Sequence, residues 1–516
     1  MSDREIFGQP SQNSTHAVSN RSPAAFVRCK AAARVISSVV LCTFYAGAAF
    51  GLDLDSDWRK VATPWTDPLQ TLPSGLERGT TIQGDQLSRT CTLGLTTQQQ
   101  REGLSLLEIL EIGICNNPTL KGNSAAIRVQ AAALGEARAT YLPTVSAGLS
   151  RQRDRTSYPE DGAESTSVAT TTKNIGLTWR ILDAGSRSAN NGAAEALLAA
   201  AVSSQSASVQ KILGSLVGAF FDVQTAQAAR QSKQQVESLA HGTLDTARRR
   251  ESRGAASQTE TLQAATALAK ASLERSRAQG DYDKSVAVLS NAMGIRSSLP
   301  LNLKADIDDE HHAIELDLGA WQLQATQLHP AILAARSQLK AARQKVIVAE
   351  ADGLPTLDLG ANIYQNGRPN QGLPTIRTTE KVVSVSLNIP IFDGFGRTYK
   401  VRGAQAQVEQ SEAGLEEVTN QVLQDVVKTY ADLKSALGNL DASATLLRSA
   451  QDTLQSIRRK FDRGASDVAE ILSAQSALAD AEAQRVRARA EWRSARLRLL
   501  ANAGTLGLSA VDRSRR

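Results

Sequence analysis

The stretch at 306–312 contains residue types that could bind a metal ion. It reads Asp-Ile-Asp-Asp-Glu-His-His, so carboxylates and imidazoles lie next to one another. Metal sites need ligands at a defined spacing, and this polar connecting stretch has none. The sequence therefore predicts neither a metal site nor a bound cofactor here.

A second candidate for chemistry is the glycine-rich run Asp393-Gly394-Phe395-Gly396. It imitates a phosphate-cradling loop but lacks the Lys-Ser or Lys-Thr pair of a P-loop, so a turn from strand to helix explains it better. The five His residues are scattered, and no nucleophile elbow is present. We therefore predict no catalytic residue and expect the chain not to be an enzyme.

The composition favours long packed helices. Aromatic residues make up 4% of the 516 residues, there are two Met residues, and Ala, Gln, Ser, Leu, Arg and Glu dominate. The formal net charge of +6 is spread along the chain, with Lys and Arg interleaved with Asp and Glu. Basic patches with interleaved aromatics are absent, so we expect an elongated helical protein that does not bind nucleic acid.

The first 48 residues have the features of an export signal. Basic residues at 28–34 precede an apolar run at 35–44, and small residues follow at 46–48. A transmembrane anchor is the alternative, although the apolar run is shorter than the roughly 20 residues that span a bilayer. We expect a chain that is exported after removal of this segment.

Removal of the signal would leave the exported chain with two of its four Cys residues. Cys29 and Cys42 would leave with the signal, and Cys91 and Cys115 would remain. We therefore expect no disulfide framework. Leu41 stands before Cys42, where lipoprotein processing needs a small residue, so no lipid anchor is expected there.

An internal repeat organises the rest of the chain. Asn117-Pro118 recurs as His329-Pro330, and Leu142-Pro143-Thr144 recurs as Leu354-Pro355-Thr356, both 212 residues later. Further landmarks recur 210 residues later. They are Asp183, Arg187, Asp222, Arg253-Gly254 and Gly294, which return as Asp393, Arg397, Asp432, Arg463-Gly464 and Gly504.

The spacing of the landmarks separates loops from helices. The two-residue change falls between the Leu-Pro-Thr and Asp landmarks, as an exposed loop allows. Beyond it both copies keep one length and contain no Pro, as helices require. We predict long helices at 187–252 and 397–462, each followed by an Arg-Gly turn and a shorter helix at 255–293 or 465–503.

The second long helix has a coiled-coil seam. Apolar residues recur every seven positions within 426–461 and within 408–422, and a four-residue step separates the two runs. Such a stutter locally unwinds a supercoil. A dimeric cytosolic coiled coil is the alternative, but it leaves the segments between the helices unexplained.

Those segments switch to a period of two residues. Apolar residues alternate with polar ones at 145–149 and 175–181, and again at 357–363 and 383–389. This pattern predicts β-hairpins at 144–182 and 356–391, with strands long enough to span a membrane and polar loops that face the cell exterior. Four strands cannot close a barrel, so we expect about three chains to share one. A soluble sheet beside the helices is the alternative.

The predicted fold class is an α+β membrane protein. It combines a long antiparallel α-helical barrel of coiled coils with a transmembrane β-barrel that is completed by trimerisation, with four strands per chain. The predicted divisions are an N-terminal extension and signal at 1–48, a polar segment at 49–103, the first repeat at 104–300, a linker at 301–319, the second repeat at 320–505 and a tail at 506–516.

Over roughly residues 104–505 the chain resembles the TolC family of outer-membrane factors. The resemblance rests on the duplicated Asn-Pro and His-Pro, the Leu-Pro-Thr strand starts, the paired Arg-Gly turns, and the strand ends Ile181-Leu182-Asp183 and Ile391-Phe392-Asp393-Gly394. It implies a homotrimer in outer-membrane lipid whose helical barrel crosses the periplasm. The implied partners are a periplasmic adaptor protein and an inner-membrane ABC transporter or pump.

The resemblance also implies a constriction at the periplasmic end. Matching the stretch after 461–464 places Glu470 and Ser473 at two ring positions and Glu260 at a partner position. The family's usual form has Asp at both ring positions, so Ser473 implies one uncharged ring. Alternatively, the two glutamates are acids near helix starts, where the macrodipole favours them. The implied docking turns are Arg253, Gly254, Arg463 and Gly464.

The function implied is that of an exit duct in a tripartite export machine. Type I protein secretion with an ABC transporter competes with small-molecule efflux by a proton-driven pump. The lack of a lipid-modified Cys favours secretion, because many dedicated efflux ducts resemble lipoproteins. A structural coiled-coil protein of the periplasm without a pore is the alternative from another class.

Overall fold

The computed structural model describes residues 67–73, 103–156, 166–254, 257–295, 302–304, 317–367, 378–463 and 468–506. The expected signal at 1–48, the 306–312 run, the tips of both hairpin loops and Gly464 lie outside these ranges. One compact unit, Leu69–Arg516, contains every helix and strand described below and is treated by itself.

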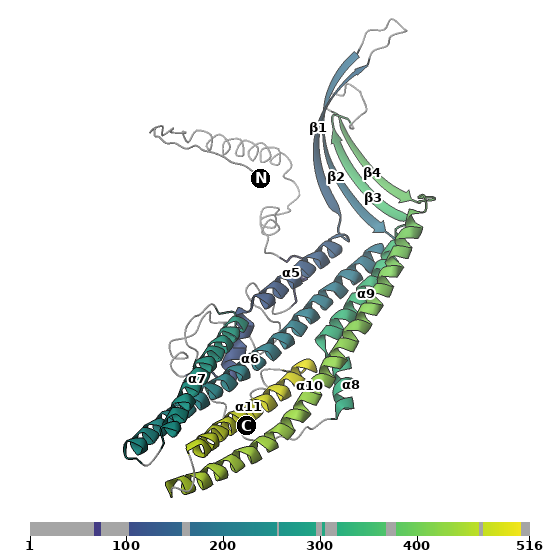
Figure 1. Cartoon of the computed structure of the whole chain (residues 1–516). Helices are drawn as coiled ribbons and strands as arrows, with labels where there is room; N and C mark the ends of the chain where they lie inside the picture. Colours follow the sequence, from purple (N-terminus) through teal and green to yellow (C-terminus); the bar gives the residue numbers. More distant parts are fainter. Residues whose placement is uncertain are drawn as a thin grey trace, which may run out of the picture. The chain divides into compact units, whose positions relative to one another are not determined.

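The elements follow one another in two matching series (Figure 1). The first series is α4 (Leu106–Asn116), α5 (Pro118–Ala139), β1 (Thr144–Thr156), β2 (Thr166–Leu182), α6 (Ser186–Ser252) and α7 (Gln258–Ala292). The second is α8 (Leu318–Leu328), α9 (Pro330–Ala351), β3 (Thr356–Gln365), β4 (Thr379–Asn388), α10 (Gly396–Asp462) and α11 (Val468–Asn502). Both long helices, α6 and α10, contain 67 residues and are about 100 Å long.

The helices form a wall of four columns. Helix α6 packs against α5 and α7 on one side and against α9 and α11 on the other, and α10 packs against α9 and α11. The shorter helices α5 and α7 form one column and α9 and α11 form another, while α6 and α10 are the remaining two columns. The sheet has the strand order β1-β2-β3-β4, and all neighbours are antiparallel.

The duplicated Asn-Pro and His-Pro landmarks are helix starts. The side chain of Asn117 accepts a hydrogen bond from the backbone N–H of Thr119 at 2.9 Å, and Pro118 opens α5. In the second copy the Nδ1 atom of His329 accepts from the N–H of Ala331 at 3.2 Å. Proline suits the first helical turn because a backbone N–H at that position would have no partner within the helix.

The Gly294 and Gly504 landmarks close the joints between stacked helices. Both have a positive φ, at 72° and 78°. A Cβ on Gly294 would lie 2.8 Å from the carbonyl oxygen of Asn116, and one on Gly504 would lie 2.9 Å from Cδ of Pro330. The end of α7 thus abuts the start of α5, and the end of α11 abuts the start of α9.

The Asp183 and Arg187 landmarks join strand β2 to helix α6. The Asp183 carboxylate accepts from the backbone N–H of Arg187 at 2.7 Å and from its Nε at 2.9 Å. The same guanidinium donates to the carbonyls of Arg180 and Ile181 at 2.7 and 2.9 Å. Three hydrogen-bonded groups at the strand end therefore fix the direction in which the helix starts.

In the second copy the corresponding arginine binds a different element. Arg397 donates its backbone N–H to Asp393 at 2.7 Å, but its side chain donates to the carbonyl of Glu350 at the end of α9. Gly353 leaves room for the Arg397 side chain, because a Cβ at residue 353 would clash with it. The run at 393–396 is a turn from strand to helix, as predicted, with Gly394 at φ 68°.

Two apolar clusters stabilise the wall. One gathers α4, α6, α7 and α11 around Leu216 and Phe220, which are fully buried. The other packs α9, α10 and α11 together. The predicted seam contributes to the second cluster with Val422, Val426, Leu433 and Leu440, all buried. Among the described residues, no helix is long and apolar enough to cross a lipid bilayer.

Cys115 in α4 is disulfide-bonded. Its partner lies outside the described ranges, so the structure contains a covalent link although no disulfide framework was expected. The pairing of cysteines cannot be deduced from their spacing in the sequence alone.

The two faces of the sheet differ in chemistry. Apolar odd-numbered side chains occupy the part of each strand nearer the helices; most of those on β1, β2 and β4 are exposed, as at Val145 (69% exposed) and Val383 (77%), whereas those on β3 are mostly half-buried. On the even-numbered face, Asn174 and Asn362 each lie over a glycine of the neighbouring strand, Gly148 and Gly176. One face is therefore suited to lipid and the other to water.

We predict that the joint at Gly504 does not tolerate a side chain. Gly504→Ala would combine a strained φ with a contact against the rigid Pro330 ring, and should lower the free energy of unfolding by about 1–3 kcal/mol. Gly438→Ala in α10, where no heavy atom lies within 4 Å of the new Cβ, is the control and should be neutral or stabilising. Urea unfolding followed by circular dichroism measures both, and equal midpoints would contradict the proposed joint.

We also predict a pH-dependent contribution from His329. Burial lowers its pKa below the usual 6.5, and Asp425 opposes this shift in part. The unfolded chain then binds more protons, so stability falls as the pH drops through about 6.5 and below. His329→Asn copies the cap of Asn117 and should weaken this dependence. Urea midpoints at pH 8, 6.5 and 5 test it, and the idea fails if both chains show the same slope.

Candidate functional site: a polar groove along the helices

Three cavities lie along the helical wall. Their volumes are about 280, 1100 and 490 Å³, and each is lined by α6 on one side and α10 on the other. Helix α11 separates these two long helices and contributes residues to all three cavities. The first two cavities share Asp222, Thr429, Asp432 and Arg498, and we call these two together the groove.

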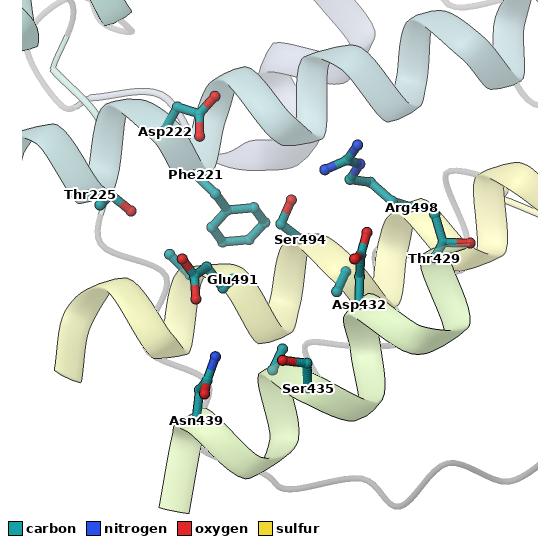
Figure 2. Close-up of a pocket in the computed structure, with 13 residues that line it drawn as sticks. Phe221, Asp222, Thr225, Thr429, Asp432, Ser435, Asn439, Glu491, Ser494 and Arg498 are labelled. Carbon is teal, nitrogen blue, oxygen red and sulfur yellow. The ribbon is translucent and has the colours of Figure 1, made fainter. Parts of the chain in front are cut away.

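The first cavity contains the duplicated Asp landmarks. Asp222 comes from α6 and Asp432 from α10, while Glu491 and Arg498 come from α11 (Figure 2). Desolvation in the cavity raises the pKa of Asp222 above its usual value, and Arg498 acts in the opposite direction. Glu491 pairs with Arg487 at 2.7 Å. This level of the groove is polar and rich in carboxylates.

Direct bonds hold α11 between the long helices. Toward α6, Lys233 pairs with Asp480 at 2.8 Å, and the Ser232 hydroxyl donates to the carbonyl of Ala479 at 2.8 Å. Toward α10, Arg485 donates to the Ser443 hydroxyl at 3.2 Å. Such bonds fix the spacing of the walls, so the groove does not depend on a ligand to form.

The predicted docking turns lie at the ends of the long helices away from the strands (Figure 1). Arg253 and Gly254 follow α6 and are exposed, and the N–H of Gly254 donates to the carbonyl of Glu251 at 2.8 Å. Gly254 has a φ of 69°, which explains why a glycine ends this helix. Arg463 is exposed after α10, while Gly464 lies outside the described residues.

The predicted constriction residues occupy helix starts. Glu260 is in the first turn of α7, where the capping hydroxyl of Ser257 accepts its N–H at 3.3 Å. Glu470 is in the first turn of α11, and Ser473 follows one turn later; both are exposed. Leu472 packs against Leu244, Ala247 and Ala264, so the ends of both helical hairpins lie together.

Sequence reasoning identified Asp222 and Asp432 as landmarks but assigned them no role. The groove depends on Arg498 and Glu491, which lie far from Asp222 in the chain and belong to no repeated motif. One signal was available: Asp222 stands between Phe221 and Val223, both buried, in a helix that is apolar at this level. A charged residue at a repeated position in such surroundings indicates a polar surface.

The chain matches the outer membrane efflux protein family over residues 110–295 and 321–505, which fall in its two repeats. It is 35% identical over 413 residues to Protein CyaE of Bordetella pertussis, covering 80% of this chain and 86% of that one. It is 24% identical over 258 residues to the alkaline protease secretion protein AprF of Pseudomonas aeruginosa, covering 49% and 53%.

The fold also matches a solved structure. The CmeC outer membrane channel of Campylobacter jejuni superposes with a TM-score of 0.69 at 15% identity, covering 81% of this chain and 91% of that one. At this level of identity the likeness concerns the fold alone.

We predict that Arg498 lowers the pKa of Asp222 and so opposes the larger effect of desolvation, which raises it. Arg498→Gln removes a cation that favours the charged carboxylate, so the pKa of Asp222 should rise further. Arg487→Gln, which removes the cation paired with Glu491, is the control and should leave Asp222 unchanged. Isotope-edited infrared titration of the Asp carboxyl band measures the shift, and an unchanged or lower pKa in Arg498→Gln would refute the coupling.

Proposed function

Because the chain belongs to the outer membrane efflux protein family, we propose that three copies form the exit duct of a tripartite machine for protein secretion of the type I kind. Members of this family are outer-membrane ducts, with the helices in the periplasm, and not enzymes. The ends of the strands farthest from the helices then face the cell exterior. The family establishes the outer-membrane duct, and our proposal adds its cargo, its three-chain assembly and its partner proteins.

The observation that supports the duct most directly is the open sheet. Strand β1 pairs only with β2, and β4 only with β3, among the described strands. A sheet in lipid cannot leave the backbone N–H and C=O groups of its edges unpaired. Three copies would supply about twelve strands, enough to close a barrel with a water-filled interior.

The groove fits the inner wall of such a duct. Its two sides are α6 and α10, and α11 contributes residues between them. Hydrated polar cargo moves past carboxylates and hydroxyls more readily than past an apolar surface, to which it would adhere. We therefore assign Asp222, Asp432 and Glu491 to the lumen.

The helical turns fit the role of contact points with the other proteins of the machine. Arg253, Gly254 and Arg463 stand at the end opposite the strands, where an adaptor protein and an inner-membrane ABC transporter would approach. The expected docking residue Gly464 follows Arg463 in the sequence. Glu470, with Ser473 and Glu260, would form the constriction beside them. The helix macrodipole offers another reason for acids at 260 and 470. Single-channel recording of Glu470→Gln distinguishes a role in the constriction from a role in stabilising the helix.

Protein cargo is favoured by the likeness to AprF, which is named a protease secretion protein. Efflux of small molecules with a pump is the second candidate, favoured by the description of the family as efflux proteins. A non-porous coiled-coil protein of the periplasm would leave the exposed apolar face of the sheet without a function.

Deletion of the gene should separate the two cargo classes. Secretion predicts that at least one large polypeptide disappears from the culture medium while susceptibility to drugs and detergents stays unchanged. Comparing secreted proteins by mass spectrometry and measuring inhibitory concentrations in the same strains tests this. An unchanged secreted set with increased drug susceptibility would overturn protein secretion in favour of efflux.

Single-channel recording in planar bilayers should detect a role for Glu470 in the pore. Purified trimers should conduct, and Glu470→Gln should lower the preference for cations over anions because it removes a carboxylate from the constriction. The control is Glu416→Gln, an exposed acid on α10 far from the turn. If Glu470 serves only its helix, its loss should cost about 0.3–1 kcal/mol of stability and leave selectivity unchanged. Trimers that never conduct would exclude the duct.

A further inference from the structure

Five cations gather on the lipid-suited face of the sheet near the loop ends of the strands. We call them the basic strip: Arg151, Arg153, Arg155, Lys173 and Lys381. All have odd numbers, and the register places Lys173 beside Leu149 and Lys381 beside Ile363. They therefore share a face with the exposed apolar side chains, and all five are themselves exposed.

The face changes character along the strands. Near the helices, the exposed Trp179 donates its indole N–H to the carbonyl of Tyr141 at 2.9 Å, as an interfacial aromatic would. Apolar side chains follow, and Lys173 on the same strand is six residues, about 20 Å, from Trp179. The β1–β2 hairpin continues beyond the ends of β3 and β4 and presents the three arginines of the strip (Figure 1).

The charges on this face have one sign. Within β1 to β4 as described, every acid occupies an even-numbered position on the opposite face: Asp154, Asp358 and Glu380. On that face Arg180 pairs with Asp358 at 2.8 Å. The strip forms no ion pair with the residues that the structure describes; Arg153 donates to the Ser167 hydroxyl at 3.4 Å.

The described residues supply no anion to this arrangement. Arg151, Arg153 and Arg155 lie at every second residue of one strand, so their guanidinium groups point the same way and repel one another. A surface that binds anions relieves this repulsion. Guanidinium groups match phosphate geometry with two parallel hydrogen bonds, and each Lys or Arg near an anionic membrane surface adds to the attraction.

We propose that the basic strip binds the phosphate groups of the anionic glycolipid in the outer leaflet of the outer membrane. The helices lie in the periplasm, so the loop ends of the strands are on the outer side. The strip begins where the apolar side chains end, which is the level of the lipid headgroups. Long Lys and Arg side chains keep their charged ends at that level while their stems cover apolar surface.

The test compares lipid retention by purified oligomers in detergent. The probe is bisphosphorylated lipid A, and the bound amount is measured by native mass spectrometry after gel filtration. The variant R151Q/R153Q/R155Q/K173Q/K381Q should retain about tenfold less lipid A than the unmodified chain. Equal retention by both would overturn the proposal.

Two further probes distinguish lipid from other anions. Lipid A without phosphates should bind weakly and equally to both proteins, and inorganic phosphate at millimolar concentration should not displace the bound lipid. If the dephosphorylated lipid is retained as well as the parent, or if free phosphate competes, the strip does not recognise a phosphorylated lipid surface.

Matched variants separate charge from folding. R151K/R153K/R155K keeps the cations and should retain lipid A. Replacement by Gln of five exposed lysines on the helices should also leave retention unchanged; these are Lys121, Lys270, Lys340, Lys345 and Lys434. All variants should form heat-resistant oligomers on a gel. Should the fivefold variant not assemble, R151Q/R153Q/R155Q takes its place, and a loss of less than about twofold would refute the proposal.

Discussion

The backbone at the edges of a four-stranded sheet is the constraint on which the rest of the structure depends. The odd-numbered side chains nearer the helices are apolar and largely exposed, so this part of the sheet belongs in lipid, yet β1 and β4 each have one unpaired edge in the chain as described. Hydrocarbon offers no partner for these N–H and C=O groups, and each unsatisfied group costs several kcal/mol. One chain therefore cannot make a stable barrel, and the function must belong to an assembly.

The helical wall repeats the arrangement of the sheet. Four strands stand above four columns, and two of the columns are built from shorter helices stacked end to end at Gly294 and Gly504. The bonds from Arg187 to the end of β2 set the angle between sheet and wall. The two repeats contain the same series of elements. Arg397, however, binds the end of α9, whereas Arg187 binds the end of β2, so the two copies differ at the turn from strand to helix.

Local patterns in the sequence were sufficient to predict the fold class. A period of two residues indicates strands, and Gly, Pro and Asp at fixed offsets indicate joints and turns, because each of these signals acts within a few residues. The groove could not be predicted in the same way. Arg498 approaches Asp222 only once α11 packs against α6. The roles of Glu260, Glu470 and Ser473 rest on resemblance and remain predictions.

Cross-linking between strand edges tests the central claim most directly. Cysteines introduced one at a time along β1, each combined with one along β4, would report which edges meet in the outer membrane. The account predicts that some pairs form disulfides between chains and produce a covalent species of three chains. Cross-links formed only within single chains, or none at any pair in a folded protein, would contradict the claim that several copies share one barrel.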